Sequence, residues 1–192
     1  MGIDRGPAVL APILLLLACS APWSDGMNQQ STDRSGFDEA VAECRGCAFT
    51  ADWWTRGGEP GPGYTSDKLT IVAAADGAAS ATYIRARFDP AFADGFRALR
   101  FTGAVDRAEA DRLLHALQRD QLFARRFPAE ERGDLADGVK DTIEVELPGG
   151  SFAKTLVEAE QLDLAGAKEV RDRLIARLEA TSRGVDLNKR LP

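Results

Sequence analysis

The sequence predicts an α+β fold, a two-layer domain in which an antiparallel sheet of about five strands carries two main helices on one face. Three observations predict it. Several segments alternate apolar and polar residues, two longer segments repeat apolar residues at helical spacing, and short turn signals separate neighbouring strands. Hydrophobic residues make up 44% of the 192-residue chain, which is enough for one globular core.

The strand pattern is clearest in two hairpins. Residues 69–73 and 82–88 alternate around the turn signal Asp76 and Gly77. Residues 142–147 place three aliphatic side chains on one face, and residues 148–150 turn the chain back into a partner strand. The expected strands are 69–73, 82–88, 97–101, 142–147 and 152–157.

Two segments carry the signature of amphipathic helices. Asp106, followed by Glu109 three residues later, is a capping pattern, and Leu113 and Leu117 then lie on one face. The second segment covers about residues 165–181. Its apolar side consists of Ala167, Val170, Leu174 and Leu178.

The strongest apolar run, residues 9–18, lies near the start of the chain. At about 1.5 Å per residue it spans roughly 15 Å, half of a bilayer's hydrocarbon core, which is too short for a transmembrane helix. Such a run is typical of a secretory signal peptide. Residues 16–19, Leu-Leu-Ala-Cys, resemble the lipobox of bacterial lipoproteins. The resemblance implies cleavage and lipidation at Cys19, and Ser20 after it favours the outer membrane.

By composition the chain divides into four parts. Residues 1–18 form the expected signal peptide, and residues 19–36 are rich in Ser, Gln, Asn, Asp and Gly, as a flexible tether would be. Residues 37–183 are expected to form a single α+β domain, and residues 184–192 a C-terminal tail. We therefore expect a lipid-anchored protein of the cell envelope, held at the outer membrane and facing the periplasm.

The domain itself is similar to an uncharacterised family of small exported bacterial proteins. The positions that carry the similarity are residues 54–58, Gly63, 67–71, Asp76, Gly77, a helix end near Leu122 and Phe123, Asp137, Gly138 and 142–145. The similarity covers about residues 49–181, with a departure at the insertion 89–95. Its marks are turns and core positions, so it implies no activity.

Charge and composition narrow the possible partners. The chain holds 30 acidic residues against 24 Lys and Arg, and this net charge of −6 leaves no surplus for phosphates. Nucleic acid is therefore not an expected partner. With Cys19 acylated, the two other cysteines and the one histidine are too few for a four-ligand zinc site. We expect no metal or cofactor, contact with the membrane through the anchor, and an envelope protein as a possible partner.

The sharpest motif is the C-x-x-C sequence at residues 44–47. In an oxidising compartment such a pair forms a structural disulfide or a redox site. Residues 37–44 have helical spacing, so Cys44 would stand at a helix C-terminus, where the helix dipole disfavours a thiolate. A disulfide between Cys44 and Cys47 is expected, with redox chemistry and free thiols as alternatives. Ala48 stands where c-type haem attachment requires histidine.

Other catalytic or metal-binding patterns are incomplete. His115 lies on the solvated face of its helix, where Asp111 is an expected i, i+4 partner, and no serine occupies a nucleophile-elbow motif. The acidic segment 129–141 has the central glycine of a calcium loop. However, Gly133 and Leu135 stand at its first and third ligand positions and offer no side-chain oxygen. A solvated turn is expected there.

Aromatic residues flank the glycine-rich segment 57–63. This segment precedes a strand, so it is expected to be a hairpin loop, because a phosphate cradle needs a helix N-terminus. Trp53, Trp54 and Tyr64 beside it form a candidate contact surface, since aromatic residues often anchor interfaces. Neighbouring residues in a strand point to opposite faces, so one tryptophan should lie in the core and the other be partly exposed.

No complete catalytic set can be assembled from these residues, so no catalytic residue is assigned. The sequence predicts a lipid-anchored envelope protein with a non-catalytic binding or structural domain. The alternative is an exported thiol-disulfide protein that uses Cys44 and Cys47. Hydrolysis by carboxylates such as Asp137 and Asp141 has no support beyond the acidity of their loop.

Overall fold

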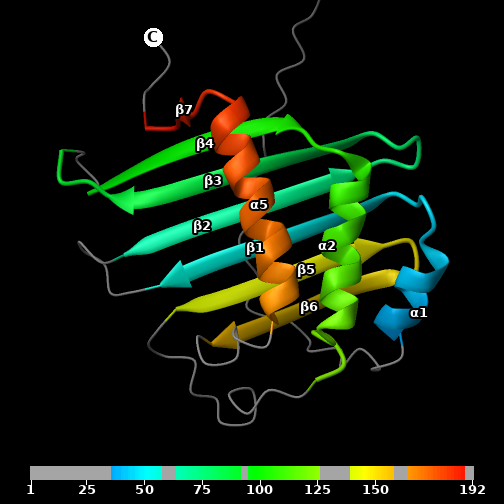
Figure 1. The fold of residues 1–192 in the computed structure, drawn as a ribbon. Helices are drawn as coiled ribbons and strands as arrows, with labels where there is room; N and C mark the ends of the chain where they lie inside the picture. Colours follow the sequence, from blue (N-terminus) through cyan, green and yellow to red (C-terminus); the bar gives the residue numbers. More distant parts are fainter. Residues whose placement is uncertain (1–35, 58–63, 92–94, 126–138, 158–163, 189–192) are drawn as a thin grey trace, which may run out of the picture. The chain divides into compact units, whose positions relative to one another are not determined.

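The computed structural model describes residues 36–57, 64–91, 95–125, 139–157 and 164–188. Within these ranges, a seven-stranded antiparallel sheet has the order β6-β5-β1-β2-β3-β4-β7, and helices α2 and α5 lie side by side on one face (Figure 1). The strands are β1 (Phe49–Gly57), β2 (Thr65–Ala73), β3 (Ala79–Phe88), β4 (Phe96–Ala104), β5 (Lys140–Leu147), β6 (Gly150–Val157) and β7 (Val185–Asp186). The helices are α1 (Gly36–Glu43), α2 (Arg107–Arg119) and α5 (Ala165–Thr181).

The α+β class and the antiparallel sheet are confirmed, but the sheet has seven strands where about five were predicted. The two additional strands are β1 and β7. β1 was not among the counted strands, although residues 53 and 54 were expected to lie in a strand beside the glycine-rich segment. β7 has only two residues and lies within segment 184–192, which the sequence assigned to a tail.

Chain order and strand order differ at β1. Strands β1 to β4 pair with their neighbours in sequence, whereas the β5–β6 hairpin pairs with the free side of β1. The ends of β1, β3 and β6 and the starts of β2, β4 and β5 therefore lie at the same end of the sheet. The β2–β3 and β5–β6 turns lie at the opposite end.

Both main helices form where the sequence placed them. The Asp106 carboxylate accepts a hydrogen bond from the backbone N–H of Ala108 at 2.9 Å, which caps the start of α2. α5 covers the same residues that its apolar spacing predicted. The buried side chains of the two helices are Ala110, Leu113, Leu114, Ala116, Leu117, Ala167, Arg171, Leu174 and Leu178.

A hydrogen bond joins the residue that follows α2 to the first turn of α5. The Asp120 carboxylate accepts a hydrogen bond from the N–H of Ala167 at 2.8 Å, so it satisfies one of the free amides of the first turn of α5. Gly166 leaves room for this approach, because a Cβ there would lie 3.0 and 3.2 Å from the two carboxylate oxygens of Asp120.

The face of the sheet under α2 and α5 has two different ends. The apolar end, next to α1 and the β5–β6 turn, holds buried aliphatic and aromatic side chains, including Phe49, Ala51, Ile71, Val145 and Phe152. The opposite end, which we call the polar end, carries Thr55, Asp67, Arg85, Arg87, Arg97 and Asp141 on the same face. At this end β1 to β4 extend beyond both helices (Figure 1).

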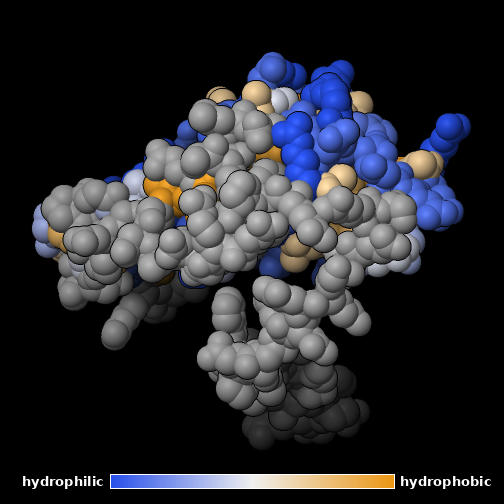
Figure 2. All heavy atoms as spheres, turned by 90° about the horizontal axis from the view of Figure 1, so that it is seen from below, coloured by the Kyte–Doolittle hydropathy of each residue, from blue (hydrophilic) through white to orange (hydrophobic). Residues whose placement is uncertain are grey.

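None of the described helices lies on the second face, which we call the open face (Figure 1). Its residues alternate with the core positions of each strand and are mostly threonines, charged residues and a few aromatics. Solvation of one face is ordinary for an antiparallel sheet. Seen from below, most of the described surface is hydrophilic, and hydrophobic residues form small separate spots (Figure 2). Within the described ranges, no helix has the length and apolarity needed to cross a bilayer.

Candidate functional site

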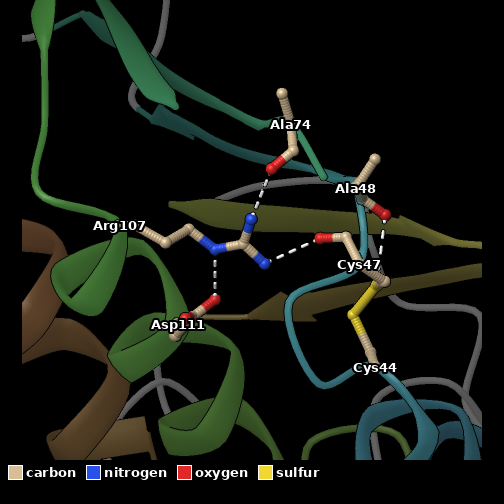
Figure 3. The surroundings of a disulfide bond; sticks show 6 residues. All are labelled: Cys44, Cys47, Ala48, Ala74, Arg107 and Asp111. Atoms are coloured by element: carbon tan, nitrogen blue, oxygen red, sulfur yellow. Dashed lines mark hydrogen bonds and ion pairs between the residues drawn. A yellow bond between two sulfur atoms is a disulfide. The ribbon is translucent and has the colours of Figure 1, made fainter. Parts of the chain in front are cut away.

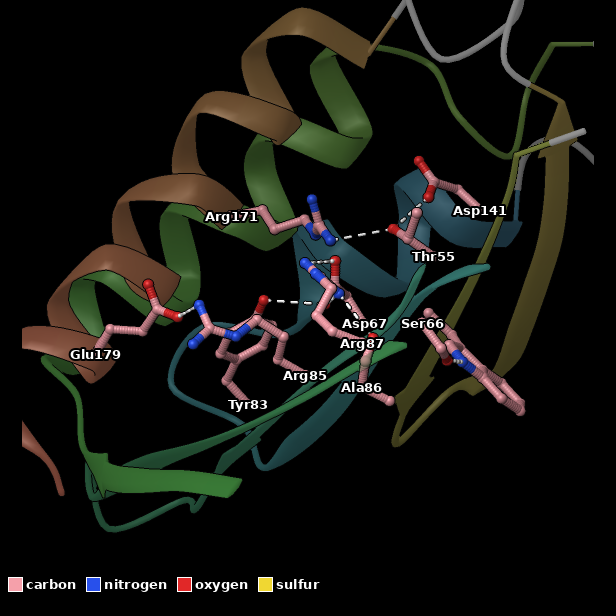
Figure 4. Close-up of polar contacts among 11 residues, drawn as sticks. Thr55, Ser66, Asp67, Tyr83, Arg85, Ala86, Arg87, Asp141, Arg171 and Glu179 are labelled. Carbon is pink, nitrogen blue, oxygen red and sulfur yellow. Dashed lines mark hydrogen bonds and ion pairs between the residues drawn. The ribbon is translucent and has the colours of Figure 1, made fainter. Parts of the chain in front are cut away.

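At the polar end, Arg171, Thr55 and Asp141 form a buried chain of contacts (Figure 4). Nη2 of Arg171 donates to the Thr55 hydroxyl at 3.0 Å, and that hydroxyl donates to the Asp141 carboxylate. Arg171 is 8% exposed and Asp141 is 1% exposed. Desolvating two opposite charges is costly, so the hydroxyl between them contributes to keeping both in place.

Arg171 is a functional candidate that the sequence analysis missed. Its Nη1 pairs with Asp172 at 3.2 Å and its guanidinium carbon lies 5.2 Å from the centre of the Trp53 ring. Its buried Nε has no hydrogen-bond partner among the described residues. A signal was available in the sequence. Position 171 is four residues after Ala167 and three before Leu174, so it falls on the apolar stripe of α5.

Asp67 of β2 binds two residues of β3. It accepts a hydrogen bond from the Tyr83 hydroxyl at 3.1 Å, and two from the Arg87 guanidinium at 2.7 and 3.1 Å. Burial and the adjacent Asp67 carboxylate raise the pKa of Tyr83 to about 12. Burial alone would lower the pKa of Arg87, but the hydrogen bond and charge of Asp67 outweigh it, so that pKa is raised.

Three arginines of β3 and β4 line an open cavity of about 350 Å³ at this end of the sheet. Arg87 and Arg97 are direct cross-strand partners, and Arg85 follows two positions along the same face. The remaining lining residues are Phe88, Asp89 and Leu99. Like charges directly opposite each other destabilise a sheet, so their clustering needs compensation.

A carboxylate from a different element compensates each arginine. Glu179 of α5 pairs with Arg85 at 2.6 Å, Asp67 of β2 pairs with Arg87, and Asp186 of β7 pairs with Arg97 at 3.3 Å. None of these three carboxylates lines the cavity. The described residues that line the cavity therefore carry a more positive net charge than the three arginines and their three paired carboxylates taken together.

The predicted cysteine pair lies at the other end of the molecule, where a disulfide joins Cys44 and Cys47. Cys44 directly follows α1, at the C-terminal end of that helix. Both cysteines pack partly against the core. A thiolate at this position would face the negative end of the helix dipole, which disfavours it.

Arg107 connects the disulfide loop to the domain (Figure 3). Its guanidinium donates to the carbonyl oxygens of Cys47 and Ala74 at 2.7 and 2.6 Å and pairs with Asp111 at 2.8 Å. Asp111 therefore binds Arg107, although the sequence suggested a pairing with His115. His115 is exposed, as the amphipathic pattern indicated.

The tryptophans lie on opposite faces of β1. Trp53 is 1% exposed and belongs to the core, so it cannot take part in a surface contact. Trp54 is half-buried on the open face, where the Arg56 guanidinium carbon lies 3.2 Å from its ring centre. The Trp54 indole N–H donates to the Ser66 hydroxyl at 3.2 Å.

Tyr64 joins an aromatic group at the same end of the sheet. Its ring stacks edge to face on Phe96 with ring centres 5.2 Å apart, and Phe96 contacts Phe88 at 5.9 Å. The sequence analysis singled out Tyr64 but not the two phenylalanines. Phe88 ends β3 and Phe96 begins β4, so the β3–β4 register makes them cross-strand partners, while Tyr64 lies more than twenty positions earlier in the chain.

Several sequence predictions lie outside the described residues. These are the signal peptide 1–18, the lipidation site Cys19, the tether 19–35, loop residues 58–63, and the part of the acidic segment up to Gly138. Among the described residues, no group of three or more His, Cys, Asp or Glu side chains could hold a metal ion.

Comparison with known proteins gives no relative from which a role could be transferred. No protein-family model matches the chain, and no curated protein matches it. Functional arguments therefore rest on the residues and their geometry.

Proposed function

We propose that this chain is a lipid-anchored protein of the bacterial cell envelope, held at the outer membrane and facing the periplasm, whose folded domain is a non-catalytic binding module. The observation that carries the binding role is the half-buried Trp54 ring under the Arg56 guanidinium on the open face. Tryptophan and arginine are the residues most enriched at the energetic centres of protein interfaces.

The anchor rests on residues 16–19, which resemble a lipobox, and on the short apolar run before them. Acyl chains contribute about 0.8 kcal/mol for each methylene group they bury, and more than one chain is needed for stable attachment. At a net charge of −6 the chain is not attracted to anionic lipid by its overall charge, so attachment depends on the anchor.

The proposed contact surface is the part of the open face that surrounds Trp54. Tyr64 and Phe96 lie at the same end of the sheet, and the side chains of Arg56 and Arg100 are exposed there. Aromatic rings provide contact area at a low entropic cost, and arginines pair with carboxylates of a partner. We infer that the partner is an envelope protein with an acidic, partly apolar patch.

Two experiments test the two parts of the proposal. Intact-mass analysis of the chain from bacterial membranes should show acylation at Cys19, and Cys19→Ser should remove it together with membrane attachment. A photo-crosslinking residue at Lys68, the open-face neighbour of Trp54, should capture one envelope protein. The crosslink should be lost with Trp54→Ala and be absent when the crosslinker is placed at the exposed Ala176 of α5. A mature chain without acyl mass contradicts the anchor, and a crosslink indifferent to Trp54 contradicts the surface.

A second candidate function is thiol-disulfide exchange, and the observation in its favour is the disulfide within the C-x-x-C motif. The helix C-terminus before Cys44 argues against an activated thiolate. The reduction potential separates the two functions. A potential below about −300 mV identifies a structural disulfide, while one near those of oxidoreductases, roughly −270 to −120 mV, supports exchange.

A further inference from the structure

We propose that the arginine-lined cavity at the polar end binds a small organic oxyanion, a carboxylate or a phosphate monoester attached to a compact apolar group. This site is separate from the proposed contact surface around Trp54, and neither depends on the other. The first support is composition. The described lining holds three arginines and one acid beside two apolar residues, so it carries a net positive charge, which favours an anionic ligand.

The second support is that several guanidinium N–H groups of the lining arginines donate no hydrogen bond within the described structure. Arg97 pairs with Asp186 through Nε, and Arg85 pairs with Glu179 through Nη1. No hydrogen bond within the described structure uses the terminal nitrogens of Arg97, or the Nε and Nη2 of Arg85. Adjacent N–H groups of this kind can bind an oxyanion through two parallel hydrogen bonds.

The third support is that the arginines are held before any ligand arrives. Carboxylates from α5, β2 and β7 each fix one guanidinium, although two of the arginines face each other across β3 and β4. Fixing flexible side chains in advance lowers the entropic cost of binding. An arrangement that served stability alone would not need three cations to converge on one cavity.

The apolar part of the ligand follows from the remaining walls. Leu99 lies on the same face as the arginines, and Phe88 at the end of β3 is the other apolar residue among the described lining. A volume of about 350 Å³ is at the lower end of the range for ligand pockets, so the ligand is small. Among the described lining residues Asp89 is the one acid, and its Oδ1 already accepts a hydrogen bond from the N–H of Ala91 at 3.0 Å.

Titration of the full chain with three probes tests the proposal. Phenyl phosphate and benzoate carry a ring with a phosphate or a carboxylate, and phenol carries the ring with no oxyanion. We expect saturable, roughly millimolar binding of phenyl phosphate or benzoate and none of phenol, measured by calorimetry and by the arginine side-chain N–H signals in NMR. The tighter of the two anions identifies the oxyanion.

Three variants locate the binding. Arg97→Gln should weaken binding about tenfold or more, because it removes a charged donor. Arg100→Gln removes the same charge from the open face of the same strand and should leave affinity unchanged. Asp186→Asn breaks the ion pair that holds Arg97 in place but keeps the guanidinium, so affinity should fall, though by less than with Arg97→Gln.

Two results overturn the proposal. One is the absence of saturable binding by both anions, or binding of phenol as tight as theirs. The other is equal weakening by Arg97→Gln and Arg100→Gln, which would show a general charge effect. Circular dichroism confirms that each variant is folded, and Arg97→Lys, which keeps the charge but not the planar fork, should bind with intermediate affinity.

Discussion

The two ends of the helix-covered face are built on the same strands but are stabilised in different ways. At the apolar end, side chains such as Phe37, Phe123 and Phe152 pack ring against ring. At the polar end, charged side chains are held by specific partners on other elements. At the apolar end, the free energy of unfolding lost on substitution should therefore follow the side-chain volume that is removed. At the polar end, it should depend on which hydrogen-bond or ion-pair partner is lost.

The largest effect is expected at Trp53, whose row separates the two ends. Trp53→Ala should lower the free energy of unfolding by about 3–5 kcal/mol, because it leaves a cavity in a close-packed core. Trp53→Phe keeps most of the ring and removes an indole N–H that has no hydrogen-bond partner in the described structure. It should cost only about 1–2 kcal/mol. Urea denaturation measures both, and equal costs would contradict the volume argument.

At the polar end, Thr55→Val tests how much free energy of unfolding is lost when a buried hydrogen-bond partner is removed. The two side chains are similar in volume, but the valine cannot bridge Arg171 and Asp141. We expect a loss of about 3 kcal/mol, because a buried carboxylate loses its hydroxyl donor. Thr82→Val on the open face is the matched control, since its hydroxyl reaches only Thr102 at 3.5 Å, and it should cost about 0.5 kcal/mol or less. If urea denaturation gave similar losses of unfolding free energy for Thr55→Val and Thr82→Val, the proposed dependence of the polar end on specific partners would be wrong.

Tyr83 makes the stability of the polar end depend on pH. Its pKa is raised from 10.0 to about 12 by burial and by Asp67. The stabilisation is fully present below pH 10, and it is lost as pH rises toward 12, because there the unfolded chain releases the proton while the folded chain holds it. The loss should reach about 2.5 kcal/mol. Denaturation at increasing pH measures it, and Tyr83→Phe should flatten the slope; an unchanged slope would refute the assignment.

The smallest effect is expected for the Arg85–Glu179 ion pair of the polar end. The side chains of Arg85 and Glu179 are 34% and 33% exposed, so water screens their attraction. Glu179→Gln should change the free energy of unfolding by less than about 1 kcal/mol, and high salt should reduce the effect further. Glu169→Gln, in the more exposed pair with Arg173, is the control and should be smaller still. A loss above about 2 kcal/mol, the size expected for a buried pair, would place the Arg85 pair in the interior.

The apolar end is the part of the molecule that sequence patterns could predict. The residues of the helix from 165 to 181 and of the hairpin around residues 148–150 were correct, because periodicity and turn chemistry are local signals. The polar end is assembled from residues far apart in the chain. Thr55 and Asp141 are 86 positions apart, and no local pattern contains their contact.

Single residues show the same limit. In the strand 82–88 the apolar residues Ile84 and Phe88 alternate with Arg85 and Arg87, yet the β2–β3 register turns the arginines toward the helix-covered face. A shift of one position in an assumed register exchanges the two faces of a strand. At this end the period of two is visible in the sequence, while the choice of face depends on the neighbouring strands.

The place of β1 in the sheet has a consequence for the timing of folding. One side of β1 pairs with β2 as soon as the next residues are made, but its other side pairs with β5. Thr55 of β1 and Asp141 of β5 are 86 positions apart, so at roughly 5–20 residues per second the synthesis of the stretch between them takes on the order of ten seconds. Throughout that interval, the backbone N–H and C=O groups along one side of β1 have no strand partner, and they lie beside two adjacent tryptophans. Such an edge promotes aggregation, so β1 needs protection before the last third of the chain is made.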